Sequence, residues 1–180
     1  KMGIKTAIHE QNAFPGVANK ALAKKVDKVM LTSSDAEKHM SCKNPPVVTG
    51  LPVRREIIKA DRDYSRAVLG LNNNDMLVLS MGGSLGARAI NEAVTDVVSK
   101  IWKDNTCNFL IATGQYGLWV PDLMKEKGVD LENAKNIEIR EYINDMARCL
   151  SASDLVICRA GASSLSEFQA LGKASILIPS

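Results

Sequence analysis

Long hydrophobic runs are missing from the sequence, although 46% of its 180 residues are hydrophobic. No run is longer than four residues, as from Met76 to Leu79, whereas a membrane-spanning helix needs ~20 apolar residues in a row. The sequence therefore predicts no membrane-spanning helix. Its apolar content is that of an ordinary globular protein and excludes an intrinsically disordered chain.

Paired cysteines are also missing. The four cysteines, Cys42, Cys107, Cys149 and Cys158, form no Cys-x-x-Cys pair, and the chain has only two histidines. This pattern argues against a structural zinc site and against a disulfide scaffold. Single cysteines scattered among alternating apolar segments are typical of free thiols in a reducing cytoplasm.

A strong charge of one sign is absent too, because the net charge is only +3. This value is too small to indicate a nucleic-acid partner. Residues 1–66 contain 13 Lys and Arg against 7 Asp and Glu, a net +6, whereas residues 67–180 contain 10 against 13, a net −3. The basic first part is compatible with phosphate groups or an anionic membrane surface, but on charge alone a solvated lysine-rich surface is the preferred interpretation.

The second part of the chain alternates regularly between short apolar segments and helical patterns. The clearest helical pattern has its apolar residues on one face for three turns, between Ile90 and Ile101. The apolar segments are rich in Val, Ile and Leu, as expected for parallel strands covered on both faces. We therefore predict an α/β, doubly wound, Rossmann-like domain. The predicted strands are 77–81, 109–112, 136–139, 154–158 and 175–178, and the predicted helices are 90–101, 118–127, 144–150 and 162–171.

The first part repeats this alternation in a shorter form and predicts a domain boundary near Val53. Residues 1–53 would be the end of one α/β domain, and residues 54–180 most of a second. A helix after the boundary would have Asp61 as its N-cap and a buried stripe of Tyr64, Ala67, Val68 and Leu71. In the first part we predict strands at 4–9, 29–31 and 47–49 and helices at 14–22 and 34–40, the first helix with an apolar stripe from Phe14 to Leu22.

In open α/β sheets, ligands bind at the carboxyl ends of the strands, and a glycine-rich segment follows the first strand of the second part. From Gly82 to Arg88, glycines allow close approach of the backbone, the next helix offers unpaired N–H groups, and Ser84 adds a hydroxyl. This combination suits a diphosphate. It is not the GxGxxG dinucleotide pattern, because Met81 replaces the first glycine. A simple tight turn between strand and helix is the alternative.

Three further segments carry candidate binding groups. In the helix predicted at 162–171, Ser163, Ser164 and Glu167 would face the mouth of the sheet, where a carboxylate accepts hydrogen bonds from a ribose diol; helix capping is the alternative. His9 to Asn12 would place four polar side chains directly after a strand. Arg54, next to the domain boundary, is placed to bind phosphate oxygens.

One short motif is misleading. Asp61, Arg62 and Asp63 match the Asp-x-Asp pattern with which some glycosyltransferases hold a metal and a nucleotide. Here the motif opens an amphipathic helix instead of ending a buried strand, so helix capping is the preferred interpretation. We assign no metal to it.

Four segments, taken together and in order, resemble one family. They are His9 to Gly16, Gly50 to Arg54, Gly82 to Arg88, and Cys158 to Ala162 leading to Glu167. Their combination resembles the bacterial undecaprenyl-diphospho-muramoylpentapeptide β-N-acetylglucosaminyltransferases of peptidoglycan synthesis, over essentially all 180 residues.

The resemblance implies a two-domain GT-B fold, with residues 1–53 in the N-terminal, acceptor-side domain and residues 54–180 in the C-terminal, donor-binding domain. It implies transfer of N-acetylglucosamine from UDP-N-acetylglucosamine to lipid I, forming lipid II, with inversion of the anomeric carbon and without a metal or other cofactor. It also implies peripheral attachment at the cytoplasmic face of the cell membrane, with an anionic lipid surface as partner.

The resemblance also assigns roles to individual residues. Arg54 and Ser84 would hold the diphosphate, the backbone of Ile143 would contact uracil, and Glu167 would bind the ribose. Glu10 is a candidate general base by its residue type alone. The implied donor-binding residues are Asn12, near the donor sugar, with Arg54, Ser84, Ile143, Ala162, Ser163, Ser164, Leu165, Ser166 and Glu167.

The chain departs from the family pattern at Leu85, where Gln is frequent, and at Leu51, where Asn is frequent. It starts at Lys1 and stops after an apolar segment, so we expect an internal fragment without turnover of its own. The alternatives are a related GT-B glycolipid synthase, a UDP-N-acetylglucosamine epimerase, or a non-catalytic nucleotide-binding module. The joint presence of the two motifs at 9–12 and 82–88 argues against the first two.

Overall fold

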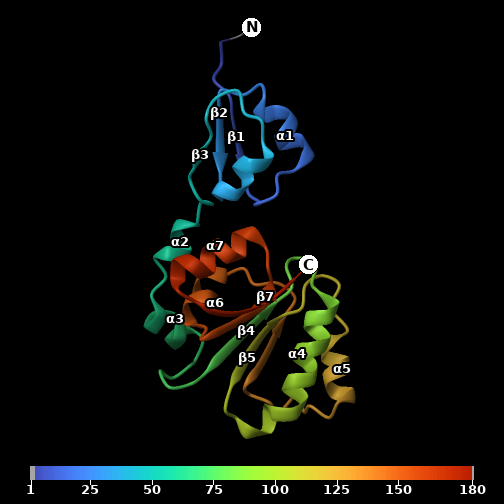
Figure 1. The fold of residues 1–180 in the computed structure, drawn as a ribbon. Coiled ribbons are helices and arrows are strands. Elements are labelled where there is room, and N and C mark those ends of the chain that lie inside the picture. Colours follow the sequence, from blue (N-terminus) through green and yellow to red (C-terminus); the bar gives the residue numbers. More distant parts are fainter. Residues whose placement is uncertain (1–2, 180) are drawn as a thin grey trace. The chain divides into compact units, whose positions relative to one another are not determined.

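The computed structural model describes residues 3–179, which form two compact units that meet in the sequence between Pro52 and Val53. Each unit has an α/β structure with a parallel sheet of its own (Figure 1). Within the described residues, no helix combines the length and the apolar character needed to cross a membrane.

The second unit contains a five-stranded parallel sheet with the strand order β6-β5-β4-β7-β8. The chain enters at the centre, runs to one edge, and then crosses to the other side, so that β4 and β7 become neighbours. The connections after β4 and β7 therefore leave the sheet in opposite directions, which opens a crevice at their carboxyl ends. The strands are β4 (Leu77–Met81), β5 (Asn108–Ala112), β6 (Ile137–Arg140), β7 (Leu155–Arg159) and β8 (Ala174–Ile178).

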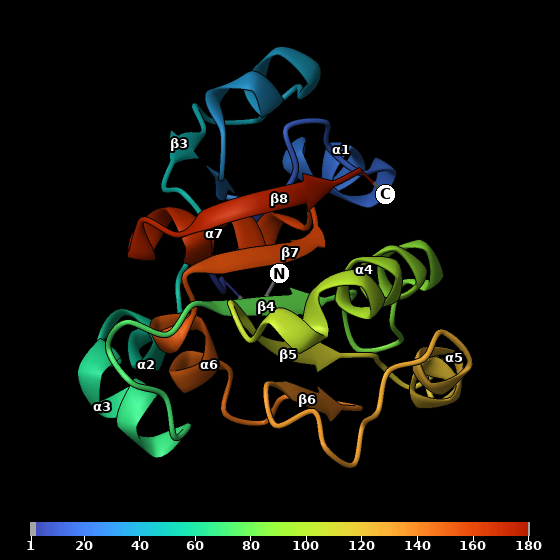
Figure 2. The same ribbon diagram turned by 90° about the horizontal axis from the view of Figure 1, so that it is seen from below.

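Helices cover both faces of this sheet (Figure 2). Alternate residues of a strand point to opposite faces, so Val78 packs into the core beneath α4 (Arg88–Ile101) and α5 (Val120–Glu126). Its neighbours Leu77 and Leu79 pack into the other core, with residues of α6 (Met146–Ala152), α7 (Ala162–Leu171) and α2 (Arg55–Ile58). The predicted doubly wound domain is confirmed. All five strands and four helices predicted from residue 77 onwards are present, and their ends agree within two residues.

The helix after Asp61 has a different buried face from the predicted one. Helix α3 (Arg62–Val68) begins as expected, with the Tyr64 N–H donating to Asp61 Oδ1 at 2.7 Å, but Tyr64 and Val68 are exposed and the predicted stripe is wrong. The buried face contains Ser65 and Arg66 instead. Arg66 is 1% exposed and donates to the carbonyl groups of Ala152 (2.9 Å) and Asn72 (2.6 Å). With the Asp154 carboxylate at 3.2 Å, these carbonyl groups pair both terminal nitrogens of a guanidinium that the hydrophobic pattern places outside, whereas its Nε has no partner within the described residues.

The first unit has a three-stranded parallel sheet in the order β1-β2-β3. Its elements are β1 (Ala7–Glu10), α1 (Val17–Ala23), β2 (Lys28–Leu31), the 3-10 helix η1 (Ser34–His39) and β3 (Val47–Val48). The strand predicted at 4–9 begins only at Ala7 and extends to Glu10, and the helix predicted at 34–40 is a 3-10 helix. The helix predicted at 14–22 begins only at Val17, after the N-cap Gly16. Its predicted stripe is exposed in this unit, whose core consists of Ala23, Val26, Val29, Leu31 and Ala36.

Candidate active site

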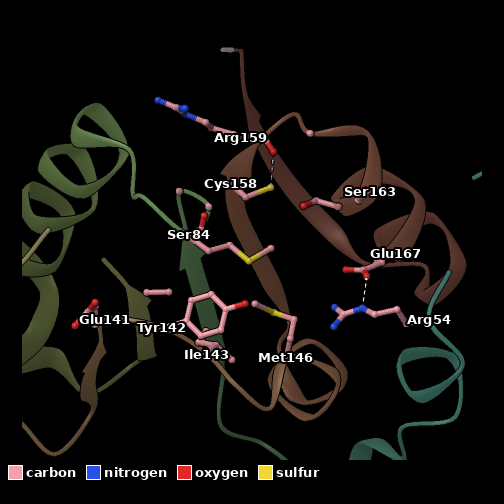
Figure 3. Close-up of a pocket in the computed structure, with 16 residues that line it drawn as sticks. Arg54, Ser84, Glu141, Tyr142, Ile143, Met146, Cys158, Arg159, Ser163 and Glu167 are labelled. Atoms are coloured by element: carbon pink, nitrogen blue, oxygen red, sulfur yellow. Dashed lines mark hydrogen bonds and ion pairs between the residues drawn. The ribbon is translucent and has the colours of Figure 1, made fainter. Parts of the chain in front are cut away.

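A cavity of ≈ 580 Å³ opens at the carboxyl ends of β4, β5 and β7, entirely within the second unit (Figure 3). Its volume lies within the range of about 300–1,000 Å³ that is usual for small-molecule sites. The strand order explains its position, because the crevice between β4 and β7 is the point where the connections diverge. The lining residues are Arg54, Met81, Gly82, Gly83, Ser84, Ala112, Glu141, Tyr142, Ile143, Met146, Cys158, Arg159, Gly161, Ser163, Ser164 and Glu167.

The glycine-rich loop between β4 and α4 is held in place by the loop that follows β5. The N–H groups of Gln115 and Tyr116 donate to the carbonyl oxygens of Ser84 and Leu85, each at 3.0 Å. The two loops touch at Gly86 and Gly114, where a Cβ on Gly114 would lie 2.1 Å from the Gly86 nitrogen. Glycine is therefore required for close packing here, and the loop that carries Ser84 is fixed by neighbouring backbone.

Helix α7 begins at the cavity without a side-chain cap. Its N-cap, Gly161, lines the cavity and has no side chain that could accept a hydrogen bond. The N–H groups of a first helical turn have no partner inside the helix and carry the positive end of the helix dipole. Together with Arg54 in the lining, this helix end gives the cavity groups that suit an anion.

Arg54 and Glu167 are bonded to each other across the cavity. The Arg54 Nε donates to Glu167 Oε1 at 3.0 Å, as Figure 3 shows. This hydrogen bond raises the pKa of Arg54, although partial burial opposes the shift. The sequence assigns Arg54 to a diphosphate and Glu167 to a ribose. In this arrangement the two charged groups neutralise each other.

The loop after β6 forms another wall of the cavity. Ile143 is buried, whereas the neighbouring Tyr142 is largely exposed. Within residues 3–179, the N–H and C=O groups of Ile143 make no hydrogen bond with the protein. They are therefore available for the edge of a planar ring, as the sequence assignment to uracil requires.

Six of the sequence-predicted donor-binding residues meet in this cavity: Arg54, Ser84, Ile143, Ser163, Ser164 and Glu167. Ala162, Leu165 and Ser166 do not line it, and the Ser166 hydroxyl donates to the Ala162 carbonyl within α7 at 3.1 Å. Their contact with the donor stays a prediction. Sequence reasoning missed Met81, Ala112 and Met146. Met81 and Ala112 end predicted strands, so the rule that ligands bind at carboxyl ends was the available signal.

Glu10 and Asn12 lie in the first unit, and Glu10 is part of strand β1 instead of a loop after it. The Glu10 carboxylate is only 2% exposed and accepts hydrogen bonds from the Asn12 N–H (2.9 Å), the Gly16 N–H (3.1 Å) and the Asn19 amide (2.8 Å). Burial would raise the pKa of Glu10, but these hydrogen bonds outweigh it and lower the pKa. The geometry argues against the candidate general base, because the carboxylate is saturated with donors. Glu10 instead fixes the loop that carries Asn12.

The fold is that of a Rossmann-like, GT-B type domain, with a cavity at the carboxyl edge of its sheet. The chain belongs to glycosyltransferase family 28, because the model of the glycosyltransferase family 28 C-terminal domain matches residues 77–180.

Curated relatives extend the similarity to the whole chain. A UDP-N-acetylglucosamine--N-acetylmuramyl-(pentapeptide) pyrophosphoryl-undecaprenol N-acetylglucosamine transferase from Desulforamulus reducens is 43% identical over 99% of this chain and 48% of the relative. A protein of the same name from Acetivibrio thermocellus is also 43% identical, over 100% of this chain and 48% of the relative. The chain thus spans about half the length of the curated relatives it matches.

Solved structures agree with this assignment. The crystal structure of Acinetobacter baumannii MurG superposes with a TM-score of 0.69 at 27% identity, covering 99% of this chain and 47% of that one. A glycosyltransferase from Rickettsia africae superposes with a TM-score of 0.53 at 16% identity, covering 90% of this chain and 48% of that one, and supports the fold alone.

Proposed function

We propose that the protein containing this chain transfers N-acetylglucosamine from UDP-N-acetylglucosamine to lipid I, forming lipid II in peptidoglycan synthesis. The observation that carries the proposal is the meeting of Arg54, Ser84 and Glu167 in one cavity at the carboxyl edge of a family 28 domain. The chain matches curated relatives over about half of their length, and the names of those relatives support the proposed substrates.

The proposed roles follow from charge and hydrogen bonding. Transfer breaks the bond between the sugar and the diphosphate and leaves negative charge on UDP. Arg54, the Ser84 hydroxyl and the uncapped start of α7 stabilise that charge without requiring a metal ion. Glu167 accepts from the ribose hydroxyls, and the free backbone groups of Ile143 bind uracil. The acceptor hydroxyl attacks the opposite face of the anomeric carbon, which inverts it, and Asn12 contacts the donor sugar.

Donor binding then exchanges one set of bonds for another. The ion pair between Arg54 and Glu167 must open, so that the guanidinium turns to the phosphates and the carboxylate to the ribose. Pairing before binding keeps both side chains inside the cavity. It also lowers the net affinity, because part of the binding energy replaces an existing interaction.

The proposal includes peripheral attachment to the cytoplasmic face of the cell membrane. In the first unit, Lys24, Lys25 and Lys28 are exposed, as are the apolar side chains of Phe14 and Val17. Such a combination favours an anionic lipid surface. Equal binding of the protein to neutral and anionic vesicles would remove this part of the proposal.

Purified lipid I, UDP-N-acetylglucosamine and the full-length protein provide the decisive assay. We expect lipid II to form, and we expect none from the 180-residue chain alone. Absence of lipid II from a correctly folded full-length protein would refute the transferase proposal. Calorimetric titration with UDP and with NAD tests the alternative of a non-catalytic nucleotide-binding module. A dinucleotide-binding module would prefer NAD, whereas the proposed site prefers UDP.

A further inference from the structure

A second cavity, of ≈ 400 Å³, lies at the amino ends of β7 and β8, at the end of the sheet opposite the candidate active site. Its volume also lies within the range of about 300–1,000 Å³ that is usual for small-molecule sites. The charged residues in its lining are Arg62 at the start of α3, Asp154 just before β7 and Lys173 just before β8. The proposed transfer gives none of these residues a role.

The amine of Lys173 is held between two carbonyl groups at the end of α6. Its Nζ donates to the Ser151 carbonyl at 2.8 Å and to the Ser153 carbonyl at 2.6 Å, and both serines line the cavity. A protonated lysine amine has three N–H donors, whereas a neutral amine has two N–H donors and a lone pair. The two carbonyl groups therefore match both donors of the neutral amine and leave its lone pair free to react.

Burial and neighbouring positive charge favour the neutral amine. The pKa of Lys173 falls from 10.5 to about 8, chiefly because of burial; the charges of Arg62 and Arg66 on α3 also lower it, whereas Asp154 opposes the shift. Asp154 is bonded to both arginines, at 2.6 and 3.2 Å, which weakens its effect on the amine. About a quarter of Lys173 is therefore neutral at pH 7.5, against about 0.1% of an ordinary lysine.

Arg62 places hydrogen-bond donors next to this amine. Its Nη1 donates to the Ser153 carbonyl at 3.3 Å, so Arg62 and Lys173 share an acceptor and their side chains lie close together. Its Nη2 donates to Asp154 at 2.6 Å. A guanidinium has five N–H donors, and the Arg62 side chain is 45% exposed, so donors remain for an anion from solvent. A phosphate group bound there would lie beside the Lys173 amine.

We propose that Lys173 is an acylation site for small acyl phosphates, whose phosphate group binds Arg62. The neutral Nζ attacks the carbonyl carbon of the acyl group, and the new C–N bond becomes that of an amide. The bond between this carbon and the phosphate oxygen breaks. Phosphate leaves with the bonding electron pair and takes the proton that Nζ loses, so no further reactant is needed. The amide keeps one N–H, and one carbonyl at the end of α6 loses its lysine donor.

The test incubates the full-length protein with acetyl phosphate and measures acetylation at each lysine by quantitative mass spectrometry of its peptides. Lys59 is the internal control, because it is exposed, belongs to the same unit and does not line the cavity. At pH 7.5 we expect Lys173 to react at least about tenfold faster than Lys59, because a large fraction of its amine is neutral. The rate at Lys173 should rise to about pH 8 and level off above it.

A variant isolates the contribution of the phosphate group. Arg62→Gln should slow acetylation of Lys173 by acetyl phosphate about two- to fivefold more than acetylation by p-nitrophenyl acetate, a donor without phosphate. Arg55→Gln, which changes an exposed arginine outside the lining, should leave both rates unchanged.

Two results would overturn the acylation site: equal acetylation of Lys173 and Lys59 at pH 7.5, or a Lys173 rate that keeps rising steeply to pH 10. Equal slowing of the two acyl donors by Arg62→Gln would overturn the assignment to acyl phosphates. The comparison of the two lysines needs no variant, so it holds even if Arg62→Gln fails to fold. None of these outcomes depends on the proposed transfer, which the lipid II assay tests separately.

Discussion

Replacing Arg54 by alanine should weaken UDP much more than uridine. Arg54 stands at the start of α2, and its guanidinium reaches into the cavity to Glu167 at 3.0 Å. If the guanidinium turns to the diphosphate when the nucleotide binds, its loss affects only ligands that carry phosphates. Uridine, which presents the same base and ribose, is therefore the internal reference.

The magnitude follows from two opposing contributions. A hydrogen bond to a charged group contributes about 1.5–3 kcal/mol. Opening the half-exposed pair with Glu167 returns up to about 1 kcal/mol of this. The net loss in Arg54→Ala is thus about 0.5–3 kcal/mol, which corresponds to about a 2- to 160-fold weaker UDP affinity at 25 °C, with the middle of the range near 20-fold. Uridine affinity should change less than about threefold on the same scale.

Calorimetric titration of both ligands measures this ratio directly. Arg55→Ala is the matched control, because Arg55 is the adjacent arginine on α2, is exposed, and does not line the cavity. An equal loss for UDP and uridine would refute the phosphate role and show that Arg54 acts by positioning Glu167. An unchanged UDP affinity would refute both roles.

The remaining predictions concern stability and pH. Gly114→Ala should lower the free energy of unfolding by more than Gly128→Ala, because both glycines have positive φ (73° and 81°) but only at Gly114 does a Cβ collide with neighbouring backbone; urea denaturation measures the difference, and equal losses would contradict the collision. Arg66→Met should cost about 3–5 kcal/mol by leaving buried partners unpaired, against about 1 kcal/mol or less for the more exposed Arg62→Met; similar urea midpoints would contradict this. Burial raises the pKa of Cys158 to about 11 from 9.0. The contribution of its protonated thiol to the free energy of unfolding is therefore complete below pH 9 and is lost as the pH rises toward 11. When the pH rises from 8 to 10, the free energy of unfolding should therefore fall by about 1 kcal/mol less in Cys158→Ala than in the wild type. Identical pH profiles of the two proteins would contradict this prediction.

The sheet of the second unit could be predicted because its residues follow a simple rule. Val78 and Leu79 are adjacent apolar residues that pack into two different cores, so a strand covered on both faces reads as a continuous apolar run. The strand order was not needed to find the elements. It was needed to explain why Ser84 and Glu167, far apart in sequence, line one cavity: β4 and β7 are neighbours.

Two of the wrong predictions, at α3 and at the end of β1, share a physical cause. A hydrophobic pattern assigns charged residues to the surface, but Arg66 and Glu10 are buried and bonded to backbone groups. On α3 this reversed the buried face, and in the first unit it placed Glu10 after the strand instead of within it. Neither partner set is visible in the sequence, because the backbone groups come from the folded loops themselves.

Buried apolar and buried polar side chains have different structural roles in this protein. Buried apolar residues define the sheet and helices, whereas buried polar side chains hold the loops at the carboxyl edge: Glu10 fixes the loop of Asn12, and Asn91 fixes the end of β5 through Thr113. A loop that is held by hydrogen bonds to one side chain has its geometry set by that side chain. Removing the side chain leaves buried polar groups unpaired and costs about 1–3 kcal/mol. Conservative changes at such supports should therefore alter ligand affinity before they unfold the sheet, whereas truncations in the apolar cores should do the reverse.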